Sequence, residues 1–278
     1  MRRASAASVA IALVLITIGL VALPSAHADR PSDRRERRAR GAASVSVGLP
    51  FDGRLRQGVL LRESDHVRYA GEYRAGGRFW GTTELVNLIE RAAARVAQRL
   101  PGARLSVGEL SAQTGGRVSG HRSHQNGRDV DIAFYMLDGD DRPFDPFGFA
   151  AFDRRGLGMQ PNQSLHFDDA RNWELIRRLL TDPDARVQYV FVADTLKRRL
   201  LATARRRGAP RAAIARAEQA LVQPSHGHPL RNHFHVRIYC PPADRPQCRD
   251  REPFHAWYPG TPPAAPAAPA ADAIAAAE

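Results

Sequence analysis

The sequence predicts an α+β domain with a mainly antiparallel central sheet flanked by helices. Three observations predict it. Segments with helical hydrophobic periodicity alternate with segments of strand character along the chain. Two strand-like segments alternate apolar and polar residues with a period of two, which is typical of sheets with one open face. A third, at residues 187–193, is apolar and rich in β-formers, as a central strand is.

Four segments have the pattern of helices: residues 82–100, 168–180, 194–208 and 211–222. A threonine at position 82 or 83 can cap the first helix, and Pro101-Gly102 ends it. Two aspartates open the second helix, where negative charge is favourable. The first helix places five apolar residues on one face: Leu85, Leu88, Ile89, Ala92 and Val96.

Four segments have the pattern of strands: residues 103–112, 128–136, 187–193 and 233–240. In the second of them, Val130, Ile132 and Phe134 alternate with Asp129, Asp131 and Ala133. The last begins HFHV, so its two histidines share one face.

The two ends of the chain differ in composition from this domain. A basic start, an apolar run and an Ala-His-Ala end predict a secretory signal peptide at residues 1–28. An uncleaved anchor is the alternative, but the run is short for a span of about 20 apolar residues. Residues 29–43 predict a charged flexible leader, and residues 259–278, rich in proline and alanine, a disordered tail or spacer. The folded domain is expected at residues 44–258.

The cysteines and the net charge indicate in which compartment the protein acts and which classes of partner it can bind. The chain has two cysteines, Cys240 and Cys248, which favours a disulfide in an exported protein, with two free thiols as the alternative. The formal net charge of +12 attracts polyanions. Export and the lack of a recognition motif exclude nucleic acid as the partner, which leaves an anionic envelope surface or cell wall.

The polar faces of two predicted strands suggest a metal site. Asp131 and His235 each lie on the open face of a strand, and His124 lies in the glycine-containing loop that enters the first of them. Such residues can converge with a vacant fourth position, as in catalytic zinc sites. Imidazole with carboxylate suits zinc better than magnesium or calcium, although copper and nickel accept the same donors. The alternative is surface histidines without a metal.

Two motifs resemble those of one enzyme family. The stretches SGHRSHQNGRDVDIAF and HFHVRIYCP are similar to motifs of the penicillin-insensitive murein endopeptidases, and the resemblance extends over about residues 44–250. These are zinc peptidases related to lysostaphin-type enzymes, D-Ala-D-Ala peptidases and the hedgehog domain, so the resemblance implies that zinc peptidase fold. It also implies a Cys240–Cys248 disulfide.

The resemblance assigns roles to individual residues. It implies that His124, Asp131 and His235 are the zinc ligands, that His233 is the catalytic histidine, and that His121 lies near the substrate. One family position, three residues before His233, holds leucine here, at Leu230. His226 or His228 is expected to line the site instead. Asp129 has three interpretations: a carboxylate that orients a ligand imidazole, a fourth ligand, or a structural hydrogen-bond acceptor.

The resemblance implies hydrolysis of peptidoglycan cross-links in the periplasm, at bonds from D-alanine to meso-diaminopimelate. A mechanism without a serine nucleophile would make the enzyme insensitive to β-lactams. The alternatives are a zinc D-Ala-D-Ala carboxypeptidase of the same superfamily and a non-catalytic zinc-containing domain that binds the cell wall. The sequence predicts no oligomeric state.

Overall fold

A computed structural model describes residues 43–225 and 228–262 of the chain. The predicted signal peptide, nearly all of the leader and the tail from residue 263 onward lie outside the described residues, and those assignments stay predictions. Within the described part of the chain, no helix combines the length and the apolar character that crossing a membrane requires.

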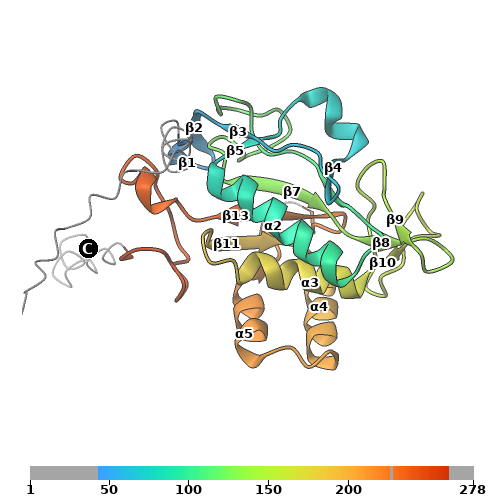
Figure 1. Cartoon of the computed structure of the whole chain (residues 1–278). Helices are drawn as coiled ribbons and strands as arrows, with labels where there is room; N and C mark the ends of the chain where they lie inside the picture. Colours follow the sequence, from blue (N-terminus) through green and yellow to red (C-terminus); the bar gives the residue numbers. More distant parts are fainter. Residues whose placement is uncertain (1–42, 226–227, 263–278) are drawn as a thin grey trace, which may run out of the picture. The chain divides into compact units, whose positions relative to one another are not determined.

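The domain is a mixed α+β structure built on a six-stranded sheet (Figure 1). The strand order is β12 (Leu221–Val222), β11 (Val187–Phe191), β13 (His233–Ile238), β7 (Asp129–Ala133), β6 (Leu105–Val107) and β4 (Val67–Tyr69). All four predicted strand segments contribute to this sheet.

The prediction of a mainly antiparallel sheet is only partly right. The three inner pairings, β11 with β13, β13 with β7 and β7 with β6, are antiparallel. The two outer pairings, β11 with β12 and β4 with β6, are parallel. A parallel pair needs a long crossover, and each outer pair has one that contains helix. The helices α4 (Asp194–Arg206) and α5 (Arg211–Ala220) connect the first, and α2 (Thr83–Arg99) lies within the second.

Helices cover one face of the sheet and form the core with it. In Figure 1, α2 and α3 (Asp169–Leu180) cross the near face of the sheet. Both helices begin as predicted, since the side chains of Thr82 and Asp168 accept the capping hydrogen bonds. Val130 and Ile132 of β7 belong to the same buried cluster as the apolar face of α2. The opposite face of β7 therefore carries the aspartates away from the helices.

Smaller elements surround this core. They comprise the hairpin of β1 (Val45–Leu49) and β2 (Asp52–Arg56), the pair β3 (Val59–Leu60) and β5 (Trp80–Gly81), a three-stranded sheet of β8 (Met136–Leu137), β9 (Pro143–Phe144) and β10 (His166–Phe167), and two 3-10 helices, η1 (Gly71–Gly76) and η2 (Pro242–Asp244). The sequence patterns predicted none of them.

The segment after β13 is fastened to the central strands. Cys240 and Cys248 form the predicted disulfide, with an S–S distance of 1.99 Å. The fully buried Arg128, which precedes β7, donates to a carboxylate oxygen of Asp250 at 2.7 Å and to the carbonyl of Arg249 at 3.0 Å. This ion pair and the disulfide hold the segment against the end of β7.

Candidate metal centre

The pairing of β7 with β13 brings the polar faces of both strands together. His235 lies opposite Asp131 in the register, His233 opposite Ala133, and Arg237 opposite Asp129. Along β13 these three residues alternate with buried apolar residues, which face the core. The two-residue period of both strands therefore places two histidines and two carboxylates on one surface.

His124 reaches this surface from the loop that precedes β7. Its side chain is fully buried, and its Nδ1 donates a hydrogen bond to the carbonyl of Leu110 at 2.7 Å. Its backbone has a φ of 65°, a left-handed conformation that is uncommon for a residue with a side chain. The backbone N–H of His124 donates to Oδ2 of Asp129 at 3.2 Å, which holds the loop in this conformation.

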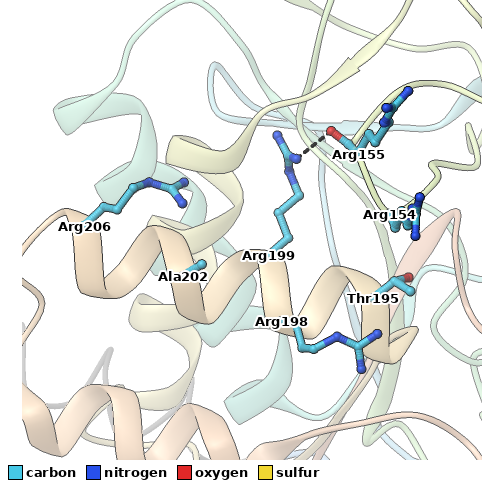
Figure 2. Close-up of a pocket in the computed structure, with 7 residues that line it drawn as sticks. All are labelled: Arg154, Arg155, Thr195, Arg198, Arg199, Ala202 and Arg206. Atoms are coloured by element: carbon cyan, nitrogen blue, oxygen red, sulfur yellow. Dashed lines mark hydrogen bonds between the residues drawn. The ribbon is translucent and has the colours of Figure 1, made fainter.

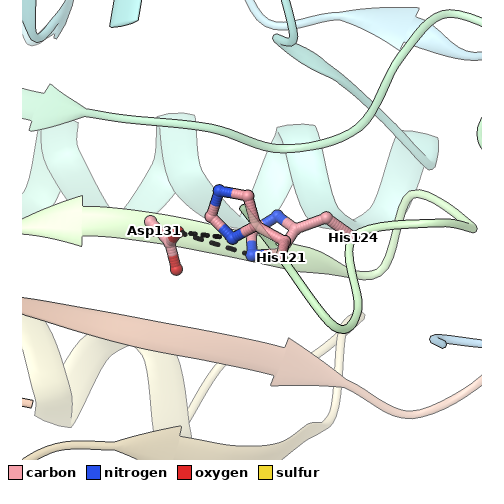
Figure 3. A group of neighbouring side chains, drawn as sticks. All are labelled: His121, His124 and Asp131. Carbon is pink, nitrogen blue, oxygen red and sulfur yellow. Dashed lines mark ion pairs between the residues drawn. The ribbon is translucent and has the colours of Figure 1, made fainter. Parts of the chain in front are cut away.

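Four imidazoles surround the carboxylate of Asp131, of which Figure 3 shows two. Nε2 of His124 lies 3.4 Å and Nδ1 of His121 3.6 Å from Oδ2 of Asp131. Nδ1 of His235 lies 2.9 Å and Nε2 of His233 3.5 Å from Oδ1. Nε2 of His124 and Nδ1 of His235 are 3.3 Å apart. The structure thus brings together all four histidines that the sequence singled out around Asp131.

The outer nitrogen of each ring faces a hydrogen-bond acceptor. His124 donates to the Leu110 carbonyl. The other three rings pair with side-chain oxygens at 2.6 to 3.0 Å: His121 with Glu109, His233 with Asn232, and His235 with Asp129. A neutral imidazole carries one hydrogen, so a ring that donates outward presents a lone pair inward.

This arrangement fits a cation. Four nitrogen lone pairs and a carboxylate converge on one small volume, and they repel one another unless a positive charge lies between them. Oδ1 of Asp131 is buried and has no hydrogen-bond partner among the described residues. Buried polar atoms are nearly always paired, and this one faces donor atoms that suit a metal ion. His121, His124 and Asp131 alone already form a group with metal-binding spacing.

The charges around the cluster shift the pKa values of its members in different directions. Burial lowers the pKa of His233 to about 4, so this ring is neutral near pH 7. Burial also lowers the pKa of His235, but the carboxylates of Asp129 and Asp131 beside the ring raise it more, to about 9. Without a metal, a proton on His235 meets part of the need for positive charge. Burial raises the pKa of Asp131, but His124, His233 and His235 beside it lower this pKa more and hold it well below its usual range.

Asp129 lies behind the cluster and does not face its centre. Its Oδ1 accepts hydrogen bonds from Nε2 of His235 at 3.0 Å and from Nε of Arg237 at 2.6 Å. Burial raises the pKa of Asp129, but Arg237 and His235 lower it by more than burial raises it, so the carboxylate is charged near pH 7. Through these contacts Asp129 holds the ring of His235; its role toward a metal ligand stays a prediction.

Three neighbours of the site were not predicted from the sequence. The carboxylate of Glu109 is 3 % exposed and holds His121 at 2.6 Å. Asn232 accepts the outer hydrogen bond of His233, and Phe149 stacks on the same ring with a centroid distance of 4.9 Å. Only Glu109 carried a signal, since it is a charged residue within a predicted strand that is otherwise mostly apolar.

The cluster opens into a cleft of about 1420 Å³. His121, His233 and His235 line it, together with His228 and Leu230. Within the described residues, His228 has no hydrogen bond or ion pair to the cluster. His226, the other candidate for this place, lies outside the described residues.

Comparison with known proteins agrees with this geometry. A family model described as "Penicillin-insensitive murein endopeptidase" matches residues 53–258. Curated proteins of that name are similar to this chain: the one from Haemophilus influenzae is 32% identical over 189 residues, which are 64% of this chain and 58% of that protein. The one from Yersinia pestis bv. Antiqua is 30% identical over 229 residues, 75% of this chain and 74% of that protein.

The alignments leave part of each relative unmatched, since this chain spans a little over half of the first and about three quarters of the second. The family model, in contrast, covers much more than half of this chain and includes every residue of the four-histidine cluster. Since that match also agrees with the motifs that suggested the resemblance, the chain belongs to the penicillin-insensitive murein endopeptidase family.

Proposed function

We propose that this protein is an exported zinc endopeptidase that hydrolyses peptide cross-links of peptidoglycan in the periplasm, with β-lactams having no effect. The observation that carries the proposal is the convergence of four imidazole lone pairs and the Asp131 carboxylate at the floor of a cleft. Membership of a murein endopeptidase family supports the substrate class. The bond from D-alanine to meso-diaminopimelate is the proposed point of cleavage.

We assign zinc to His124, Asp131 and His235. These residues have the closest donor atoms in the cluster, with separations of 2.9 to 3.4 Å. Three protein ligands leave room for water or substrate, as catalytic zinc sites do. The kinship to hedgehog and D-Ala-D-Ala peptidase folds is part of the same proposal, and the ligands on adjacent antiparallel strands support it.

Zinc in this place would supply Lewis acidity for activating water and polarising a carbonyl. The protein's own part is proton transfer by His233. Its ring is neutral near pH 7, its Nδ1 is held by Asn232, and its free Nε2 points into the cluster. His233 can therefore take a proton from the attacking water and pass it to the leaving amine. His121 lies at the mouth of the cluster, where it can contact the substrate.

The size of the cleft favours an endopeptidase over a carboxypeptidase. A pocket for a small ligand has about 300 to 1000 Å³, whereas this cleft has about 1420 Å³. A cross-link extends on both sides of the bond to be cut and needs the larger space. A terminal dipeptide, which a carboxypeptidase would cut, does not need this space.

Mass spectrometry of cross-linked muropeptide dimers tests the function. We expect the mature protein to convert dimers into monomers, to stop when a chelator is added, and to resume when zinc is restored. Loss of a single alanine would show a carboxypeptidase instead. A protein that binds zinc and gives no product under any condition would be the non-catalytic wall-binding domain.

Asp129→Asn tests the orienting role of that carboxylate. We expect zinc affinity to fall by about 10- to 100-fold, because the neutral amide no longer polarises the His235 ring. Competition with a chromophoric chelator measures this affinity. Asp65→Asn, at an exposed aspartate without an ion pair among the described residues, is the control. Unchanged affinity in Asp129→Asn would contradict the role.

A further inference from the structure

A second cleft, of about 660 Å³, lies away from the metal centre, between α4 and the turn at residues 153–156 (Figure 2). Arginine dominates its lining, which includes Arg154, Arg155, Thr195, Arg198, Arg199 and Arg206. We call it the arginine cleft. No residue of this lining contributes to the cleft around the four histidines.

The helix wall of the arginine cleft is one face of α4. Arg198 and Arg199 follow Thr195 by three and four residues, and Arg206 follows Arg199 by seven, so these side chains recur along one side of the helix. The rise of about 1.5 Å per residue puts Arg198 and Arg206 about 12 Å apart along the axis. The cleft is therefore elongated and presents cationic groups along its length.

Arg199 fixes the two walls relative to each other. Its guanidinium forms an ion pair with Asp169 of α3 at 2.5 Å and donates to the carbonyl of Arg155 at 2.5 Å, the bond that Figure 2 shows. This side chain therefore belongs to the scaffold of the cleft, and it holds the turn against α4.

The other arginines lack compensating charge. Within the described part of the chain, no carboxylate lies in ion-pair distance of Arg154, Arg155, Arg198 or Arg206. Oγ1 of Thr195 is buried in the same place and has no hydrogen-bond partner there. Several unpaired guanidinium groups and a free hydroxyl around one concave surface attract an anion, and the planar guanidinium matches a carboxylate with two hydrogen bonds.

Both walls of the arginine cleft are hydrogen-bonded to residues 230 and 231, which lead into β13, the strand that carries His233. Phe152, just before the turn, donates from its backbone N–H to the carbonyl of Arg231 at 2.8 Å. Ala193, just before α4, donates to the carbonyl of Leu230 at 2.7 Å. A bound anion would therefore lie on elements that are linked to the segment just before His233.

We propose that the arginine cleft binds free carboxylates of peptidoglycan stem peptides and so retains the enzyme on the intact wall. The proposal rests on the proposed function, which makes these peptides the substrate. Diaminopimelate and terminal alanine leave free carboxylates on stems beside the one being cut. The cleft lies outside the catalytic cleft, so it acts on retention at the polymer and not on the chemical step.

Sedimentation with intact sacculi tests the proposal. The cleft variant is Arg154→Gln, Arg155→Gln and Arg198→Gln together, which leaves the scaffold residue Arg199 in place. The matched control removes three exposed arginines elsewhere, by Arg62→Gln, Arg95→Gln and Arg211→Gln, so both proteins lose the same charge. A second sample of sacculi has its carboxylates converted to neutral amides.

We expect the cleft variant to bind untreated sacculi about tenfold more weakly than the control, as the loss of three exposed ion pairs predicts. Both should bind amidated sacculi equally, and both should cleave soluble dimers at the wild-type rate. Equal binding of the two variants to untreated sacculi would overturn the proposal. So would a difference that persists on amidated sacculi and is abolished by inorganic phosphate, since the ligand would then be a phosphate. If wild-type protein cleaves no dimer, the proposed function fails, and sedimentation still decides the role of the cleft.

Discussion

Replacing His124 by alanine is expected to remove zinc and peptidase activity together. The ring lies in a fully buried position, is anchored to Leu110 from outside and presents Nε2 to Asp131 and His235. Alanine removes one of three proposed ligands. The position of the ring is closed to solvent, so water has no open path to take its place. Loss of an outer partner costs 10- to 100-fold in affinity, so loss of a ligand should cost more than about 100-fold.

Elemental analysis of the purified variant measures zinc content, and dimer cleavage measures activity. His66→Ala is the control, since His66 is exposed and distant in sequence from the cluster. Near-ultraviolet circular dichroism shows whether the variant keeps its packing. If it does not, Asp131→Asn, which keeps the size of the side chain, makes the same test. One zinc per chain in a folded His124→Ala protein would refute the ligand assignment.

Replacing His233 by alanine is expected to leave zinc bound and to lower turnover by about 10²- to 10⁴-fold, the usual contribution of a general acid–base group. The side chain is held by Asn232 and Phe149. The proposed ligand set uses one nitrogen each of His124 and His235, which leaves the inward nitrogens of His233 and His121 free among the four rings. Because the pKa of His233 is lowered to about 4, its ring is unprotonated and can act as a base from pH 6 to 8. Activity should fall toward pH 4, where the ring becomes protonated.

The rate at which muropeptide dimers are cleaved, measured in samples quenched over time, gives the turnover number. The zinc content of the same protein separates a catalytic defect from loss of metal. His166→Ala is the matched control, because its ring contacts Asp141 outside the cleft. Full activity of His233→Ala would assign the proton transfer to another group, and His121 would be the first to test.

Local patterns predicted the parts of this protein in which short-range periodicity determines structure. The alternation along 129–134 and 233–238 told which residues face the core, and so which of them share the polar face. The parallel pairing of β11 with β12 could not be foreseen, because Leu221 and Val222 lie within the helix predicted at residues 211–222, whereas α5 ends at Ala220 and these two residues form the strand. The partnership of Glu109 with His121, and of Phe149 with His233, could not, because it depends on how loops far apart in sequence pack.

The left-handed backbone of His124 has a consequence for the evolution of the domain. A residue with a side chain in this conformation destabilises the folded state by roughly 1 kcal/mol, and glycine would remove that strain. Stability alone would therefore favour glycine at position 124, and glycine does occupy position 127 of the same loop, where φ is 75°. On the proposed ligand assignment, a histidine at this position provides a metal-binding nitrogen at the expense of stability. Consensus stabilisation of this loop should accordingly leave position 124 untouched.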